Sequence, residues 1–243
     1  MTRIRVMTWN IHGALGGNPR FDLDRVVALV KRHAPDIVAL QEIDSRRARG
    51  ANVGDPFDVL QEALGTHGVG ARTVVTTDGA YGQALISRWP LFGTEIRDLS
   101  YPEREPRRAI CSEVATPYGP LRVIATHLGL SLHERRRQAF ALLDMLGVLD
   151  RPTVALGDFN DWLWAGSVRR SLARALPGRS RHRTFPSWLP LFRLDRVYLW
   201  PAPALLGSHT DPAARAISDH LPVIADISFA GTAERQPRLR ATE

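Results

Sequence analysis

Five short apolar runs in this sequence end in polar side chains of the kinds that bind metal ions or phosphate. They end at Trp9-Asn10, Gln41-Glu42, Thr126-His127, Gly157-Asp158-Phe159-Asn160 and Leu194-Asp195, and a sixth cluster, Ser218-Asp219-His220, directly precedes the last apolar run. Each run is consistent with a buried strand. Taken singly, each polar end also fits a turn, a cap or a core hydrogen bond. Six together are hard to attribute to chance, and strands sharing a sheet would bring them to one rim, where α/β sheets commonly bind ligands.

The stretch from Thr153 to Asp161 is the densest of these clusters. Apolar residues 154–156 predict a short buried strand, Gly157 breaks the pattern, and Asp158, Asn160 and Asp161 follow. In extended geometry Asp158 and Asn160 would point the same way, because side chains alternate along a strand. One carboxylate beside one amide suits a water molecule, a metal ion or a phosphate oxygen. A polar turn is the competing interpretation, and Asp161 is expected only to cap the following segment.

Helix signals are clear at several places. Asp22 is expected to cap a helix that ends before Pro35. Ser131 and Glu134 form a capping box that opens a helix to about residue 149. Its inward side chains are expected to be Phe140, Leu143 and Leu146. Shorter helices are predicted at 57–64 and 168–176.

The remaining periodic segments predict strands. They are expected at 4–9, 36–40, 73–77, 82–87, 91–98, 109–116, 121–126, 154–156, 194–199, 204–209 and 221–227. The β-α-β pattern of residues 4–40 favours a parallel sheet, whereas turns at 78–79 and 117–120 indicate hairpins. We expect one domain over 1–229, followed by a flexible tail at 230–243.

Amino-acid composition and net charge narrow the range of possible binding partners only slightly. The 243 residues carry a formal net charge of +7, and Lys31 is the single lysine among 32 basic residues. No run of like charges marks a nucleic-acid arm. No segment has the length of a membrane span and no signal-peptide core precedes the first strand, so we expect a cytoplasmic monomer without membrane insertion. The single Cys111 is expected to be a buried thiol.

The ordered motifs resemble the endonuclease/exonuclease/phosphatase superfamily, which includes DNase I-like nucleases, inositol polyphosphate 5-phosphatases and neutral sphingomyelinases. The matching blocks are Thr8-Trp9-Asn10, Gln41-Glu42, residues 82–90, Thr126-His127-Leu128, Gly157-Asp158-Phe159-Asn160, Leu194-Asp195 and Ser218-Asp219-His220. The resemblance spans residues 4 to about 228. It implies a four-layer α/β sandwich of two packed, mainly antiparallel β-sheets flanked by helices.

The resemblance also implies a metal-dependent phosphoester hydrolase. Glu42 is similar to the main metal ligand, with Asn10 and Asp219 helping to position the ion. Oxygen ligands suit Mg²⁺ or Mn²⁺. Zinc at His127 and His220 is the weaker alternative, because the chain has one cysteine and no HExxH pattern.

The resemblance implies roles for the other rim residues too. Asp158 is similar to the residue that orients or deprotonates the attacking water, and Asn160 to a neighbour that holds a phosphate oxygen. His220 would contact the scissile phosphate, with Asp195 or Asp219 setting its tautomer. His127 would bind phosphate or protonate the leaving oxygen. The assignment of general base and general acid stays open.

Three further side chains are candidates for substrate contacts. Arg108, with Arg107, is placed to approach the phosphate, although ion pairs with nearby glutamates compete. Phe185 and Trp188 would form an apolar wall beside the site or plug the core. The favoured function is a phosphodiesterase or phosphatase acting on nucleic acid, a phospholipid or a small phosphoester. The alternative is a non-catalytic phosphate-ligand or nucleic-acid binding protein on the same fold.

Overall fold

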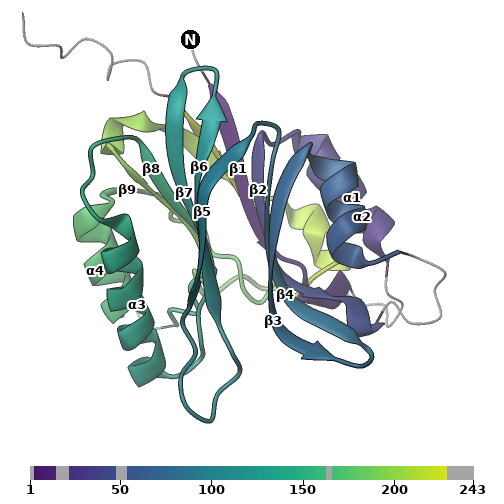
Figure 1. Ribbon diagram of the computed structural model, residues 1–243. Coiled ribbons are helices and arrows are strands. Elements are labelled where there is room, and N and C mark those ends of the chain that lie inside the picture. The colour runs from purple at the N-terminus through teal and green to yellow at the C-terminus, as the bar shows by residue number, and fades with distance from the viewer. Residues whose placement is uncertain (1–2, 15–21, 48–53, 163–165, 229–243) are drawn as a thin grey trace, which may run out of the picture.

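The computed structural model describes residues 3–14, 22–47, 54–162 and 166–228. The expected tail at 230–243 lies outside these residues. The described chain forms two β-sheets packed face to face, with helices on the outer face of each sheet (Figure 1).

The first sheet contains both the earliest and the last described strands. Its strands are β1 (Ile4–Asn10), β2 (Ile37–Asp44), β3 (His67–Thr76), β4 (Gly79–Ser87), β11 (Leu205–His209) and β12 (Val223–Ile227). Their order is β11-β12-β1-β2-β4-β3. β1 and β2 are parallel, and the other neighbouring pairs are antiparallel. The expected hairpin of β3 and β4 is therefore present.

The second sheet is built from the middle of the chain. Its strands are β5 (Leu91–Asp98), β6 (Arg108–Thr116), β7 (Gly119–His127), β8 (Thr153–Asp158), β9 (Gly178–Arg179) and β10 (Asp195–Trp200). Their order is β5-β6-β7-β8-β10-β9, and β7 and β8 form its parallel pair. The parallel sheet that the β-α-β pattern favoured is thus wrong for most strand pairs, since most neighbouring strands in both sheets are antiparallel.

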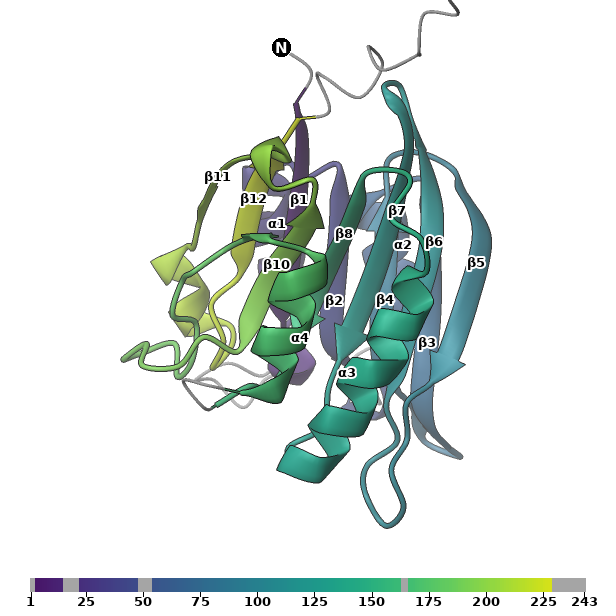
Figure 2. The ribbon, with the colours of Figure 1, turned by 90° about the vertical axis from the view of Figure 1, so that its left-hand side faces the viewer.

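Four helices complete the layers among the described residues. α1 (Leu23–His33) and α2 (Pro56–Leu64) cover the first sheet, while α3 (Leu132–Leu146) and α4 (Ser167–Ala175) cover the second (Figure 2). Short 3-10 turns lie at His12–Ala14, Ser45–Arg47, Ala202–Ala204 and Pro212–Ala216. The arrangement is the four-layer sandwich that the resemblance implied.

Three apolar cores hold the layers together. One lies between the two sheets, one under α1 and α2, and one under α3 and α4. Because the inner strands are buried on both faces, their sequences are nearly continuous apolar runs. This explains why a simple alternation of apolar and polar residues was absent from most of them.

The period of two along each strand connects the inter-sheet core to the rim. Val154 and Leu156 of β8 lie in that core, and Asp158 continues the same face. Asn10 on β1 and His127 on β7 likewise follow the core residues of their own strands. Asp195 instead begins β10 and precedes its core residues, because β10 runs antiparallel to β8. The four polar side chains therefore meet where the two sheets end together.

The inward face of α3 differs from the prediction. The capping box of Ser131 and Glu134 is present, but the helix ends at Leu146. Phe140 is 58% exposed, so its expected inward orientation is wrong, whereas Leu146 is buried. Gln138 explains the rotation: its side chain accepts from Gly129 N and donates to Leu99 O, so a polar residue occupies the inward face. Cys111 is only partly buried, and that burial raises the pKa of its thiol.

Candidate active site

Asn10 connects the two sheets at the rim. Its Nδ2 donates to Glu42 Oε1 at 2.8 Å and to Asp158 Oδ2 at 3.0 Å. Glu42 belongs to the first sheet and Asp158 to the second. A single amide thus holds together a carboxylate from each sheet.

Gly157 sets the close approach of β7 and β8. Its φ is +153°, and a Cβ at this position would lie 1.9 Å from Thr126 O. No other residue fits that space without moving the backbone. The break that Gly157 made in the apolar pattern is therefore a packing requirement, and it delivers Asp158 beside His127.

A β-bulge aims Glu42 into the rim. The pairing of β2 with β4 shifts register between Leu40 and Ile43, and Glu42 has a φ of +58°. A bulge inserts an extra residue and re-aims the side chain there. A left-handed backbone at a non-glycine residue is strained, and such strain concentrates at functional sites.

Several polar side chains of the rim lie close to Asp158 Oδ2. It lies 3.6 Å from His127 Nε2 and 3.9 Å from His220 Nε2, besides the hydrogen bond from Asn10. Burial raises the pKa of Asp158, and the charge of Asp195 raises it further. A carboxylate with a raised pKa, surrounded by donors, is suited to accept a proton near neutral pH.

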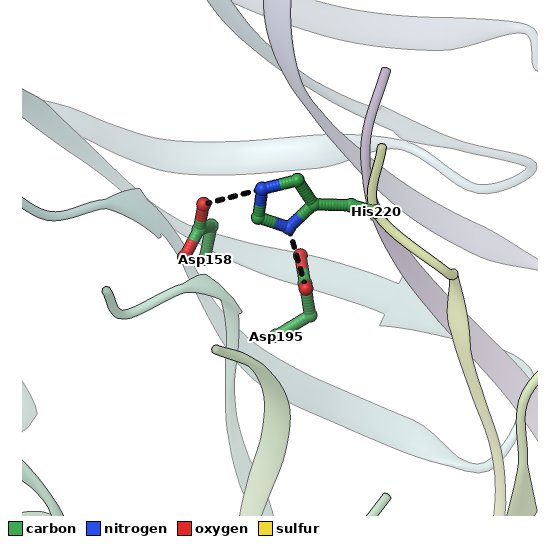
Figure 3. A group of neighbouring side chains, drawn as sticks. All are labelled: Asp158, Asp195 and His220. Carbon is green, nitrogen blue, oxygen red and sulfur yellow. Dashed lines mark hydrogen bonds and ion pairs between the residues drawn. The ribbon is translucent and has the colours of Figure 1, made fainter. Parts of the chain in front are cut away.

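His220 and Asp195 form a buried pair beside Asp158 (Figure 3). His220 Nδ1 and Asp195 Oδ2 are 2.8 Å apart. Burial lowers the pKa of His220, but Asp195 and Asp158 outweigh that effect and raise it to about 10. His220 is therefore an imidazolium at neutral pH in the metal-free protein. The three residues also offer ligand atoms within 4.8 Å of one another, so their geometry is consistent with a metal site as well as with a proton-handling group.

His127 is held in the opposite charge state. Burial lowers its pKa well below the usual value, and Arg107 lowers it further. Arg107 Nη1 lies 3.2 Å from His127 Nδ1. Because a guanidinium only donates, Nδ1 must accept and Nε2 must carry the proton. His127 therefore presents a neutral N–H group toward Asp158.

A second group of polar side chains lies around Glu42. His12 Nδ1 is 3.5 Å from Glu42 Oε2 and 3.5 Å from Asp219 Oδ1. Burial raises the pKa of Glu42, but hydrogen bonds from His12 and Asn10 and the charge of His220 outweigh that effect, and the pKa falls to about 2. Asp219 Oδ1 is buried and has no hydrogen-bond partner among the described residues. Two carboxylates that lie close to the same imidazole nitrogen, one of them with a buried oxygen that accepts no hydrogen bond from the described residues, fit a divalent cation.

The segment that carries His220 is anchored from both sides. Trp9 Nε1 donates to His220 O at 3.0 Å, and Ser218 Oγ donates to Asn10 O at 2.7 Å. The Phe185 ring lies 4.8 Å from the His220 ring. Position 220 is thereby fixed relative to β1 and to the loop before β10.

Comparison with known proteins agrees with this arrangement. The family model described as "Endonuclease/Exonuclease/phosphatase family" matches residues 7–220. The chain is 31% identical over 250 residues to the uncharacterized protein YbhP of Escherichia coli (strain K12), covering 92% of this chain and 95% of YbhP. The chain belongs to the endonuclease/exonuclease/phosphatase family.

Solved structures of the family share the fold. A Beutenbergia cavernae endonuclease/exonuclease/phosphatase is 24% identical, with a TM-score of 0.74 over 94% of this chain and 72% of that one. The Bacteroides thetaiotaomicron mannosyl-6-phosphatase Bt3783 is 17% identical, with a TM-score of 0.66 over 93% of this chain and all of that one. At these identities the likeness concerns the fold alone. Across the described residues, no helix is long and apolar enough to cross a membrane.

The structure brings most of the predicted site residues to this rim: Asn10, Glu42, His127, Asp158, Asn160, Asp195, Asp219 and His220. Asn160 does not continue an extended strand, because β8 ends at Asp158 and Asn160 has a φ of +47°. It reaches Asp158 instead through its backbone N–H, which donates to Asp158 Oδ1. Asp161 accepts from Arg169 N in the first turn of α4, as the capping role predicted.

The three side chains that were candidates for substrate contacts lie in different surroundings. Phe185 packs on His220, but Trp188 is 71% exposed, so the interpretation that Trp188 plugs the core is wrong. Arg107, not Arg108, makes the contact with His127, and it also pairs with Glu105 at 2.6 Å. Arg108 lies opposite Asp98 in the β5–β6 register. Sequence reasoning did not identify His12, although its position two residues after Asn10 was an available signal.

Proposed function

We propose that this chain is a divalent-metal-dependent hydrolase of phosphoesters, acting on phosphodiesters. Family membership supports a phosphoesterase chemistry, and the rim supplies the groups that this chemistry needs. A phosphodiester is anionic and has a poor leaving group, so its hydrolysis requires charge neutralisation and an activated water.

The observation that carries the proposal is the environment of Asp158 Oδ2. A buried carboxylate with a raised pKa faces a neutral N–H donor, His127, and a cationic donor, His220. These three groups are of the kinds that would activate a water molecule and bind a phosphate oxygen.

In this proposal each residue has one task. Asp158 accepts a proton from the attacking water, and the backbone N–H of Asn160 holds its other oxygen. His127 Nε2–H donates to a non-bridging phosphate oxygen. His220, held by Asp195, places positive charge against the phosphate as the bond to the leaving oxygen breaks. The departing oxygen then takes a proton from solvent, and Asp158 releases to solvent the proton that it accepted from the attacking water.

Glu42 and Asp219 would hold the metal ion, with Asn10 and His12 beside them. A bound Mg²⁺ or Mn²⁺ would supply Lewis-acid neutralisation of the phosphate charge. The oxygen-rich donor set favours these ions over zinc.

Hydrolysis of bis-p-nitrophenyl phosphate and p-nitrophenyl phosphate tests the proposal. We expect turnover with Mg²⁺ or Mn²⁺, a higher kcat/KM for the diester, and no activity in EDTA. Asp158→Asn should lower kcat by about 10²- to 10⁴-fold, the usual contribution of a general base. Asp24→Asn, on the exposed face of α1, is the matched control.

A panel of nicked, abasic and single-stranded DNA, RNA, phospholipids and inositol phosphates would identify the substrate class. Wild-type activity that persists in EDTA would contradict the metal-dependent mechanism. Tight binding of a panel member without turnover, unchanged in Asp158→Asn, would favour the non-catalytic binding protein instead.

A further inference from the structure

A small recess is lined by residues that follow β8, by α4, and by residues before and within β10. Its polar lining includes Arg169, Arg183, Arg193, Arg196 and Asp161, with Trp162 at one side. We call it the arginine recess. Four guanidinium groups against one carboxylate leave three excess positive charges in a small space.

In two of these arginines, the buried Nε has no hydrogen-bond partner among the described residues. Arg196 is only 4% exposed, and its Nε has no hydrogen-bond partner among the described residues. Arg193 Nε is also buried and unpartnered. A buried N–H group without a hydrogen-bond partner costs free energy, and native structures seldom retain one without a reason.

The electrostatics of Arg196 indicate that the cations are crowded. Burial lowers the pKa of Arg196, and the nearby charges of Arg169 and Arg193 lower it further. Asp161 opposes this effect, but one of its oxygens already accepts from Arg169 N. The single carboxylate of the recess therefore does not balance the arginines.

The recess is built on the face of β10 that the catalytic site does not use. Asp195 points toward the rim and pairs with His220, so Arg196, the next residue, points toward α3 and α4. Tyr198 shares that second face, and its buried hydroxyl also has no partner among the described residues. Two unpartnered donors, Arg196 Nε and the Tyr198 hydroxyl, thus share one face of β10, and Arg193 lies just before that strand.

Aromatic rings separate the recess from the catalytic rim. Trp162 lines the recess and contacts Phe185 at 5.3 Å, and Phe185 contacts His220 at 4.8 Å. One phenyl ring therefore stands between the wall of the recess and the imidazolium of the proposed site.

We propose that the arginine recess is a second oxyanion site, which binds a phosphoryl group distinct from the one that is hydrolysed. Arginine matches this ligand because its planar fork donates two parallel hydrogen bonds to phosphate oxygens. The phosphoryl group has two possible sources, a second phosphate on the substrate itself or free inorganic phosphate. The first source rests on the proposed function, whereas the binding site does not.

Titration calorimetry of the metal-free protein with inorganic phosphate tests the site without catalysis. Arg183→Met and Arg193→Met are the variants, because neither side chain is fully buried. Arg170→Met is the matched control, since Arg170 is exposed on α4 and does not line the recess. We expect each recess variant to weaken phosphate binding at least tenfold and the control to leave it unchanged.

Asp158→Asn separates the two sites. If the recess binds phosphate, the Arg193-dependent binding persists in Asp158→Asn, even though that variant is expected to lose hydrolysis. Binding should also weaken as salt increases, because the recess is cationic and partly open. No binding by the wild type, or equal binding by the wild type and both recess variants, would overturn the proposal.

A matched pair of chromogenic diesters distinguishes the two sources. Thymidine 5′-(p-nitrophenyl phosphate) and its 3′-phosphorylated form differ by a single phosphate. A KM at least fivefold lower for the bisphosphate, lost in Arg193→Met, would assign the recess to substrate. Equal KM values together with Arg193-dependent phosphate binding would assign it to free phosphate.

Discussion

His127 Nε2 lies 3.6 Å from Asp158 Oδ2 because the two residues are register partners on adjacent parallel strands. The pairing of β7 with β8 runs without a bulge from Arg122 and Thr153 to this pair. The separation is therefore fixed by the backbone of a buried sheet. Sites on regular elements are positioned more accurately than sites on loops.

The neutral state of His127 predicts how its replacements behave. If His127 acts as an N–H donor, His127→Gln keeps an amide donor and His127→Ala does not. Removing one such donor lowers kcat by about 10²- to 10³-fold, so the alanine variant should show a loss of that size and the glutamine variant a clearly smaller one. Steady-state kinetics with bis-p-nitrophenyl phosphate measures this. Equal losses would indicate that His127 transfers a proton instead.

Replacing Arg107 is expected to change the tautomer of His127. Its guanidinium donates toward Nδ1 and lowers the pKa of the imidazole, although burial is the larger cause. In Arg107→Met the pKa of His127 should rise and the Nε2–H tautomer should lose its preference. Two-bond ¹H–¹⁵N correlation of the histidine rings reports both. Arg108→Met is the control, and an identical change there would contradict the assignment.

The raised pKa of His220 predicts that the stability of the folded protein depends on pH. Its folded pKa, raised to about 10, lies above the usual unfolded value of about 6.5. Its contribution is therefore fully present below pH 6.5 and is lost as pH rises toward 10, with a size of a few kcal/mol. The raised pKa of Asp158 also makes stability fall as pH rises, but between its usual value of 3.8 and about 6, which is below the window of His220.

Urea unfolding of the metal-free protein measures this contribution. The difference in unfolding free energy between the wild type and His220→Gln should shrink steadily between pH 6.5 and pH 10. A difference that stays constant over that window would mean that Asp195 and Asp158 do not hold His220 in its charged form.

Much of the fold followed from local signals. Asp22 and the Ser131–Glu134 box mark helix starts, and both are present as caps. The buried strands were recognisable as apolar runs, and their polar ends meet at one rim because strand periodicity continues the inter-sheet face. Sequence therefore indicated the site through residues that extend regular strands.

Features that depend on tertiary contacts were not predictable in this way. The bulge that re-aims Glu42 arises from pairing with β4, and nothing local marks a glutamate with positive φ. Helical spacing placed Phe140 on the buried face of α3. Gln138 occupies that face instead, because its side chain hydrogen-bonds to the backbone of Gly129 and of Leu99. Arg107 directly precedes β6 and His127 ends β7, so only the pairing of these two strands brings the two residues into contact.

Gly157 offers a direct test of how the backbone supports the site. Gly157→Ala places a Cβ where Thr126 O lies at 1.9 Å and forces an alanine into a φ of +153°. Either β7 and β8 separate or the strand end shifts, and strained backbone of this kind costs about 1–3 kcal/mol before any clash is counted. We expect a lower midpoint of urea unfolding and a loss of hydrolytic activity that exceeds the loss of folded protein.

A matched variant separates strain from mere substitution. Gly207→Ala adds the same methyl group on β11, where nothing lies within 4 Å of the added Cβ and no positive φ is required. That variant should retain wild-type stability to within about 0.5 kcal/mol, as surface substitutions usually do. If Gly157→Ala were equally well tolerated, the distance between His127 and Asp158 would not depend on the glycine, and the register of β7 and β8 alone would have to account for it.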